Sequence, residues 1–228
     1  YRGIFAAARE YFALYQLQLA RDEIHPLSIK AQEAFSLGAQ IGGLTLLALD
    51  MRSERTKSQV ISAQSWKAIY DWLDTISPGR RSQTPSARHL LLMSSIPVVH
   101  PEFALLEKLL GIFPGRQELE DDLRDQWLSV PHRQERLRVV HRLLAFAVAK
   151  KCRVTGLSGD VHVGALGIME SARSTADDPS TQVINQLTSS GIVHPPPTGV
   201  ALYFLENVTG KKMELDRDLY SEMLEFPG

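Results

Sequence analysis

The hydrophobic and polar positions of the chain predict a hairpin preceded by a helix. Residues 1–21 carry a broad apolar face at helical spacing, which predicts a helix that packs on a core. Residues 35–50 consist of two apolar runs that flank Gly42 and Gly43, and paired glycines permit the positive φ of a tight hairpin turn. The second run, residues 44–49, is almost entirely apolar and predicts a central strand that is buried on both faces.

Two crossover units are predicted after this hairpin. Residues 59–75 have the pattern of a helix, and residues 89–93 that of a second buried strand. A strand, a helix and a strand at this spacing predict parallel strands. Residues 102–150 are helix-rich and lead, through a long helix that starts near Pro131, into a third strand at 152–157. The chain is therefore expected to adopt an α/β fold.

The remaining residues are expected to form short strands and turns, with strands at 163–169, 182–187, 200–205 and 212–215. A proline-rich stretch at 194–199 cannot be helical.

Three of the predicted strands are followed by clusters of polar residues. Because the carboxyl ends of parallel strands meet at one edge of a sheet, neighbouring strands would bring these clusters together. A carboxylate and an imidazole two positions apart point the same way in extended chain. Such groups, together with guanidinium groups, suit a metal-assisted reaction on an anionic substrate. The clusters are Asp50, Arg52 and Arg55; Ser94, Ser95 and His100; and Asp160 and His162.

Both functional interpretations have structural alternatives. On spacing alone, the charged residues after Asp50 are more typical of a solvated strand end with a local ion pair. A single Asp-x-His pair occurs by chance in many proteins, and a metal ion takes about four to six ligands. Either Asp160 and His162 do not hold a metal, or the other ligands lie upstream of Tyr1, where we expect further sequence because the chain does not begin with Met.

Length, charge and cysteine content limit the number of domains, the binding partners and the compartment that we expect. A length of 228 residues suits one large domain or two small ones. The net charge is −1 without long blocks of like charge, so we expect neither a nucleic-acid surface nor a membrane patch. No apolar run is long enough for a transmembrane helix. The single cysteine, Cys152, favours a reducing compartment such as the cytoplasm, although a signal upstream would export the protein.

Other catalytic motifs fit less well. The segment from Gly156 to Asp160 lacks the last glycine of the Gly-x-Ser-x-Gly elbow around Ser158. Cys152 starts a predicted strand and is expected in the core. A glycine-rich phosphate loop with Lys-Ser/Thr is absent from the sequence.

The segment Leu157–His162 resembles the "LSGDVH" motif of the alkaline phosphatase D (PhoD-like) metallophosphoesterases. Other segments resemble the family in the same order, so that the resemblance covers most of the chain. They are the helix with Arg9-Glu10-Tyr11-Phe12, the "LDxRxxR" segment at 49–55, Asp125-Gln126-Trp127 followed by Glu135-Arg136, and the "TSS" segment at 188–190.

This resemblance implies a calcineurin-like αββα sandwich of mixed β-sheets flanked by helices. It implies hydrolysis of phosphate mono- or diesters by a metal cluster, commonly iron and calcium, with manganese, zinc or magnesium as alternatives. Asp160 and His162 are then metal ligands, Arg52 and Arg55 bind the substrate phosphate, and Asp50 orients their segment. Gly159 lets the backbone approach the site closely, beside Ser158, and His100 is a further candidate.

The chain also departs from the family pattern. The earlier ligands of the family lie on a Gly-Asp-x-x-x-x-Asp element and an Asp-Asp-His-Glu element, and neither occurs here. Residues 1–228 are therefore expected to be the C-terminal portion of one PhoD-like domain, with little activity and weak metal binding alone. The alternative is a protein that kept the fold, lost catalysis and serves as a binding or scaffold module.

Overall fold

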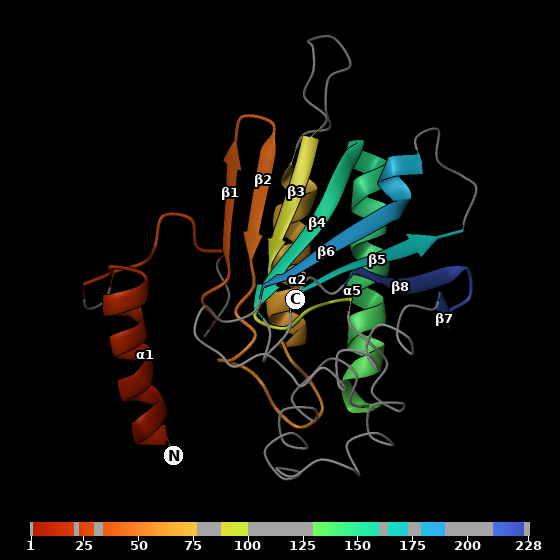
Figure 1. The fold of residues 1–228 in the computed structure, drawn as a ribbon. Coiled ribbons are helices and arrows are strands. Elements are labelled where there is room, and N and C mark those ends of the chain that lie inside the picture. Colours follow the sequence, from red (N-terminus) through yellow and green to blue (C-terminus); the bar gives the residue numbers. More distant parts are fainter. Residues whose placement is uncertain are drawn as a thin grey trace.

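The computed structural model describes residues 2–20, 23–29, 34–76, 88–99, 130–159, 164–172, 179–189 and 212–225. These residues form an eight-stranded sheet in the order β1-β2-β3-β4-β6-β5-β8-β7, together with three α-helices (Figure 1). The helices are α1 (Arg2–Gln16), α2 (Ala63–Thr75) and α5 (Val130–Lys150), and a short 3-10 helix spans Pro179–Gln182. The strands are β1 (Leu37–Ile41), β2 (Leu44–Ala48), β3 (Arg88–Met93), β4 (Cys152–Gly159), β5 (Ala165–Ser171), β6 (Val183–Ser189), β7 (Met213–Asp216) and β8 (Leu219–Glu225).

The predicted hairpin and crossovers are confirmed. Strands β1 and β2 pair antiparallel across Gly42, whose φ of 58° is the left-handed value that favours glycine. Strands β2, β3, β4 and β6 are parallel neighbours, and α2 lies between β2 and β3 in the sequence as expected. The remaining strands pair antiparallel, so the sheet is mixed and the fold is α/β.

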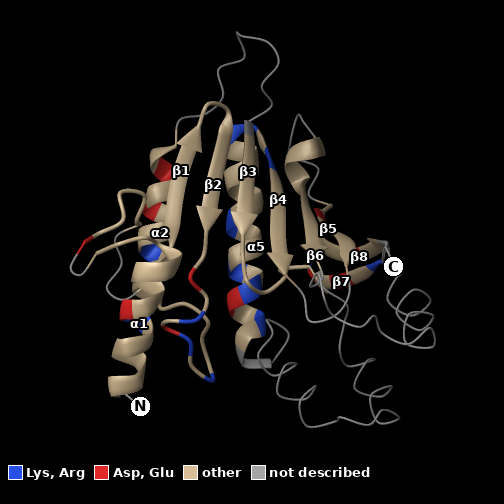
Figure 2. Cartoon of the chain, turned by 60° about the vertical axis from the view of Figure 1, so that its left-hand side comes forward, with Lys and Arg blue, Asp and Glu red and all other residues tan. Residues whose placement is uncertain are grey.

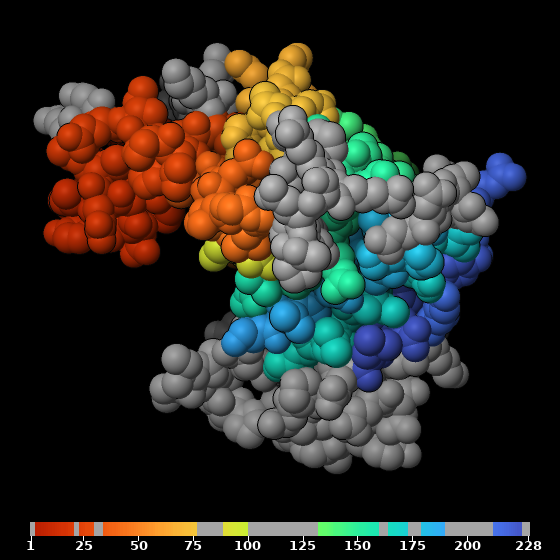
Figure 3. All heavy atoms as spheres, turned by 90° about the horizontal axis from the view of Figure 1, so that it is seen from above, coloured from red at the N-terminus to blue at the C-terminus, as the bar shows by residue number. Residues whose placement is uncertain are grey.

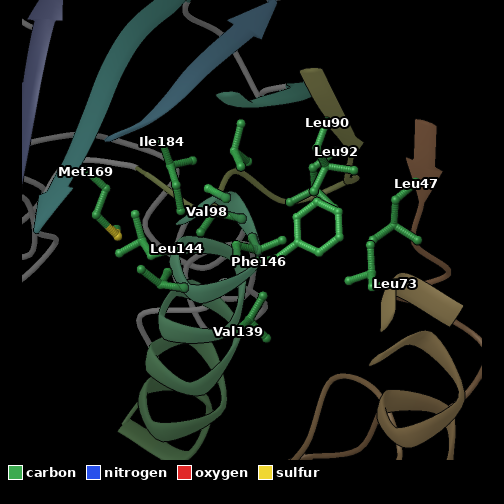
Figure 4. Close-up of a cluster of buried hydrophobic side chains, with 14 of the residues drawn as sticks. Leu47, Leu73, Leu90, Leu92, Val98, Val139, Leu144, Phe146, Met169 and Ile184 are labelled. Atoms are coloured by element: carbon green, nitrogen blue, oxygen red, sulfur yellow. The ribbon is translucent and has the colours of Figure 1, made fainter. Parts of the chain in front are cut away.

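Helices α2 and α5 cover the same face of the sheet (Figure 1). Helix α5 places Val139, Leu144 and Phe146 in the core, where Figure 4 shows the Phe146 ring beside Leu90 and Leu92 of β3. The core also takes Ile69 and Leu73 from α2, both of which are almost wholly buried. This apolar layer holds the parallel strands in place and therefore fixes where their carboxyl ends lie.

The start of α2 differs from the prediction. Ser62 caps the helix by accepting a hydrogen bond at its Oγ from the backbone N–H of Ser65 at 3.2 Å, so the helix begins at Ala63 rather than near residue 59. The carboxylate of Glu54 accepts from the Ser62 backbone N–H at 3.0 Å and from the Ser65 hydroxyl at 2.9 Å. The segment that leaves β2 is thereby tied to the first turn of α2.

The two faces of the sheet differ in burial. One row across the strands faces the helices and is fully buried at Leu47, Leu92 and Gln186. The next row carries Met93 and Leu187, which are 46% and 48% exposed. The prediction that residues 44–49 are buried on both faces is therefore wrong, because Leu44, Leu46 and Ala48, on the face away from the helices, are only partly buried. The second sheet of the expected sandwich is not among the described residues.

The prediction that the first helix packs on the core is also wrong for most of its length. Helix α1 ends at Gln16, and its side chains Tyr11, Leu14 and Tyr15 are exposed. Seen from above, the helix projects from the β1 side of the molecule (Figure 3). Its apolar contact is with Phe35, whose ring centroid lies 5.1 Å from that of Phe12. Apolar periodicity identified the helix correctly, although it does not specify what the apolar side chains meet.

Several sequence predictions fall outside the described residues. These are the helices expected at 102–129, the proline-rich stretch at 194–199 and the strand at 200–205. Strand β8 was missed, because its alternation of Leu219, Ser221 and Met223 places a serine among the buried residues. Among the helices of the described residues, none has the length and apolarity needed to cross a bilayer.

Candidate functional site

The carboxyl ends of four parallel strands meet at one edge of the sheet. Backbone hydrogen bonds continue the pairing just past the strands, from Leu49 N–H to Met93 O and from Ser94 N–H to Leu157 O, each at 3.0 Å. The segments that follow β2, β3 and β4 therefore leave the sheet side by side, as the sequence predicted. Asp160 follows the last residue of β4 directly, and it lies, with His162 and His100, outside the described residues.

Asp50 organises the segment that leaves β2. Its Oδ1 accepts hydrogen bonds from the backbone N–H groups of Arg52 and Ser53, both at 3.0 Å, and its Oδ2 accepts from that of Phe35 at 2.8 Å. Burial raises the pKa of Asp50, but hydrogen bonds from Ser53, Phe35 and Arg52 outweigh burial and hold the pKa below its ordinary value. The carboxylate is thus engaged by the backbone of its own turn and by the backbone of the segment that precedes β1.

The two arginines of this segment differ in position. Arg52 is exposed and lines a cleft of about 530 Å³ together with Ser53 and with Ser95, which follows β3. Arg55 is half-buried, and its backbone N–H donates to Arg52 O at 3.5 Å. Figure 2 shows basic and acidic residues gathered where the chain leaves β2. A cationic group therefore stands at the edge where the candidate ligands follow β4, and the phosphate-binding role of Arg52 and Arg55 stays a prediction.

Gln186 is a polar residue in the core that sequence reasoning missed. Its side chain is 0% exposed, its Oε1 accepts from the Val98 backbone N–H at 3.0 Å, and its Nε2 donates to Ser158 Oγ at 3.0 Å and to Leu187 O at 3.2 Å. The amide thus joins β6, β4 and the segment that follows β3. Glycines Gly156 and Gly167 stand opposite it on the two neighbouring strands.

The glycine on β4 makes room for this amide. A Cβ at Gly156 would lie 2.6 Å from Gln186 Oε1, a distance that real Cβ atoms do not reach. On the other side of the loop, Arg136 of α5 donates from Nε to Val98 O at 2.7 Å. Both backbone groups of Val98 are therefore held by buried side chains. Together, Gln186 and Arg136 fix the segment after β3 against the end of β4.

Glu135, the neighbour of Arg136, ties α5 to the segment before α2. Its carboxylate is buried and accepts hydrogen bonds from Val60 N–H at 2.8 Å, Ile61 N–H at 3.0 Å and Trp66 Nε1 at 2.7 Å. The Glu135-Arg136 pair of the resemblance therefore consists of two buried residues. Glu135 holds the segment before α2, and Arg136 holds the segment after β3. Their buried charges were not predicted; a Glu-Arg pair in the charged half of a helix looks like a solvated surface pair.

Ser158 and Gly159 complete the described portion of the edge. Ser158 lies within β4, and its Oγ accepts from Gln186 and lies 3.3 Å from Thr188 Oγ1. A nucleophile elbow places its serine on a turn between strand and helix, so this geometry does not fit one. A Cβ at Gly159 would meet no atom within 4 Å, so packing does not require glycine there, and its role in close approach stays a prediction.

No group of three or more His, Cys, Asp and Glu side chains within the described residues is placed to hold a metal ion. Asp50 lies at this edge too, but its oxygens accept three hydrogen bonds from backbone N–H groups, which fits the orienting role expected for it. The donors that suit a metal at this edge are the carboxylate of Asp160 and the imidazole of His162, which follow β4 in the sequence.

Part of the chain matches a known protein family. Residues 102–218, just over half of the chain, match the family described as PhoD related phosphatase. The chain belongs to the PhoD-related phosphatase family. This PhoD-related match contains α5, β4, β5 and β6, and with them Gly159, Asp160 and His162. It also contains the Gln186 and Arg136 side chains that hold the segment after β3.

The chain is also similar to a curated protein that is described as uncharacterized. The chain is 32% identical over 146 residues to the uncharacterized protein YGR266W of Saccharomyces cerevisiae, an alignment that covers 54% of this chain. The alignment covers 20% of the yeast protein, so the chain spans only about a fifth of that relative's length.

Proposed function

We propose that the protein containing this chain is a metal-dependent phosphoesterase, and that Asp160 and His162 supply two of its metal ligands. The observation that carries this proposal is the alignment of β2, β3 and β4 as parallel neighbours. That alignment brings the segment of Arg52 and the start of the Gly159-Asp160 element to one edge of the sheet. The family match supports the reaction class, phosphate ester hydrolysis.

The donor set fits a hard or borderline metal ion, although it forms only a portion of a site. A carboxylate and an imidazole suit iron, manganese or zinc, and carboxylates suit calcium or magnesium. A bound metal cluster supplies Lewis-acid polarisation of the phosphate and activation of the attacking water. The proposal therefore includes further ligands outside this chain, in line with the resemblance.

The described residues have defined tasks in this proposal. Arg52 and Arg55 bind the oxygens of the substrate phosphate, since guanidinium groups match the geometry of phosphate. Asp50 holds the backbone of their turn through the hydrogen bonds from Arg52 and Ser53, and the hydrogen bond from Phe35 ties that turn to the segment before β1. Gln186 keeps the end of β4, and therefore the start of the ligand element, in register with its neighbours.

The apolar face opposite the helices supports the proposal that this chain is the C-terminal portion of a larger domain. Met93 and Leu187 are about half exposed there, and Leu157 stands between them in the same row. A sheet normally buries such a face against a second layer. In the proposed αββα sandwich, the second sheet covers this row.

The test is hydrolysis of bis(p-nitrophenyl) phosphate and p-nitrophenyl phosphate by the full-length protein before and after chelation. We expect the rate to fall to background with EDTA and a strong iron chelator, and to return when iron and calcium, or manganese, are added. Unchanged hydrolysis after verified removal of metal would contradict metal dependence. A folded protein that hydrolyses neither ester with any of these metals would instead support the binding or scaffold alternative.

A further inference from the structure

A cleft between α1 and the β1–β2 hairpin opens along the candidate site. The cleft encloses about 530 Å³, a size common for small-molecule sites. One wall is a face of α1 that carries Phe5, Arg9 and Phe12. The other wall includes Phe35, which precedes β1, and the segment after β2. Figure 2 shows α1 beside that segment.

The walls combine aromatic rings with a cation. The Arg9 guanidinium carbon lies 4.5 Å from the Phe35 ring centroid and 5.6 Å from that of Phe5, within the range of cation–π contacts. Phe12 packs against Phe35 with a centroid distance of 5.1 Å. The rings therefore place Arg9 at the wall of the apolar end of the cleft, which leucine and alanine side chains also line.

The far end of the cleft reaches the candidate catalytic edge. Arg52 and Ser53 line it from the end of β2, and Ser95 lines it from the segment after β3. Strand β3 is the direct neighbour of β4, whose last residue is Gly159. The cleft therefore extends from α1 to the segment after β3, the strand that pairs with β4.

The charges of the lining favour an anion. Arg9 and Arg52 are its two cationic residues, and Asp50 is its only acidic one among the described residues. Both oxygens of Asp50 already accept hydrogen bonds from backbone N–H groups. A neutral apolar ligand would bring no charge to match the two guanidinium groups, and a polar sugar phosphate would leave the phenylalanines in contact with water.

We propose that this cleft binds the organic group of an amphiphilic phosphate ester, one whose apolar group of about six carbons or more packs against the paired rings of Phe12 and Phe35 that line it. The cleft then selects substrates by their apolar group while Arg52 directs the phosphate toward the edge. This inference rests on the proposed phosphoesterase function, and it adds the class of substrate.

The test compares the binding of hexylphosphonate and methylphosphonate to the full-length protein by calorimetry. Phosphonates share the anionic head of a phosphate ester and are not hydrolysed by ester cleavage, so binding is read without turnover. Each buried methylene is worth about fourfold in affinity, and we expect hexylphosphonate to bind at least about tenfold more tightly. Phe12→Ala and Phe35→Ala should reduce this ratio to below about threefold.

Two further variants distinguish binding in the cleft from a general effect on α1 and from binding of the anionic head group. Tyr15 is another aromatic residue of α1, but it is 70% exposed and does not line the cleft. Tyr15→Ala should therefore leave the ratio of the two phosphonate affinities unchanged. Arg52→Gln should weaken both phosphonates to a similar extent. Circular dichroism of each variant verifies that α1 and the sheet are folded.

The outcomes distinguish this inference from the proposed function. Equal affinity for the two phosphonates, no binding of either, or an unchanged ratio in both phenylalanine variants would overturn the cleft as a substrate site. If the protein hydrolyses phosphate esters in a metal-dependent way but shows no chain-length preference, the proposed function stands and this inference fails. If the protein prefers hexylphosphonate but hydrolyses no phosphate ester, the cleft binds amphiphilic anions and the proposed phosphoesterase function fails.

Discussion

Replacing Gln186 by leucine tests the polar junction that holds the candidate edge together. The leucine side chain has a similar size but can neither accept the hydrogen bond from Val98 N–H nor donate to Ser158 Oγ and Leu187 O. Because Val98 is 1% exposed, water cannot readily take the place of the lost acceptor.

The expected cost follows from these contacts. A buried N–H group without an acceptor costs about 1–3 kcal/mol, and the two bonds donated by the amide contribute about 1 kcal/mol together after solvation. We therefore expect Gln186→Leu to lower the free energy of unfolding by about 2–4 kcal/mol. The opening free energy at Val98 should fall by about 1–3 kcal/mol, which is an increase in amide exchange of about 5- to 150-fold.

Hydrogen exchange of the peptide that contains Val98, together with chemical denaturation, measures both quantities in the full-length protein. Ile184→Val is the matched control, because Ile184 lies on the same strand, is also 0% exposed, and loses only one methyl group at about 0.5–1.5 kcal/mol. If Gln186→Leu exchanges at Val98 no faster than this control, the amide does not hold the loop and the reasoning is wrong.

A double-mutant cycle checks the same junction from the opposite strand. The three atoms nearest to a Cβ at Gly156 all belong to the outer side chain of Gln186. Gly156→Ala should therefore cost about 1–3 kcal/mol alone and close to nothing in a Gln186→Ala background. Equal costs in the two backgrounds would show that the glycine is needed for another reason.

Two further substitutions test the half-buried carboxylate of Asp50 and the buried carboxylate of Glu135. Asp50 has a folded-state pKa below its ordinary value of 3.8, so its charge adds stability above about pH 4 that is lost as the pH falls through the folded pKa. The melting temperature of Asp50→Asn should thus differ most from that of the wild type at neutral pH and approach it below pH 3.8; a constant difference would refute the assignment. Glu135→Gln turns an NH₂ group toward at least one of three N–H donors and should lower the free energy of unfolding by about 2–4 kcal/mol, measured by chemical denaturation. The control Glu214→Gln, at an exposed position, should change it by less than about 0.5 kcal/mol.

Local patterns predicted the parallel strands and the edge at which they end. The Gly42-Gly43 turn, the apolar runs and the helices between them specify β1 to β4, because each signal lies within a few residues of the structure it predicts. Asp50 could likewise be placed at the turn after β2, since two of its three backbone partners are two and three residues away.

Long-range partners explain what the sequence did not predict. Gln186 meets Val98 across 88 positions and Ser158 across 28, and Glu135 meets Val60 across 75. Nothing near a glutamine in a strand indicates whether it faces a core or solvent, and only the glycines opposite it leave the space it fills. The cleft beside α1 depends in the same way on the meeting of Phe12 with Phe35, which periodicity alone does not specify.

The central claim is that Asp160 and His162 are metal ligands of a phosphoesterase, and metal content measured beside activity tests it most directly. The full-length wild type, Asp160→Ala and His162→Ala are purified without chelator, analysed by ICP-MS and assayed on bis(p-nitrophenyl) phosphate. Asp71→Ala is the control, since Asp71 lies exposed on α2 in an ion pair with Lys67. We expect both site variants to lose metal and at least about 100-fold in rate while the control matches the wild type. Site variants that keep the metal content and the full rate of the wild type would contradict the account.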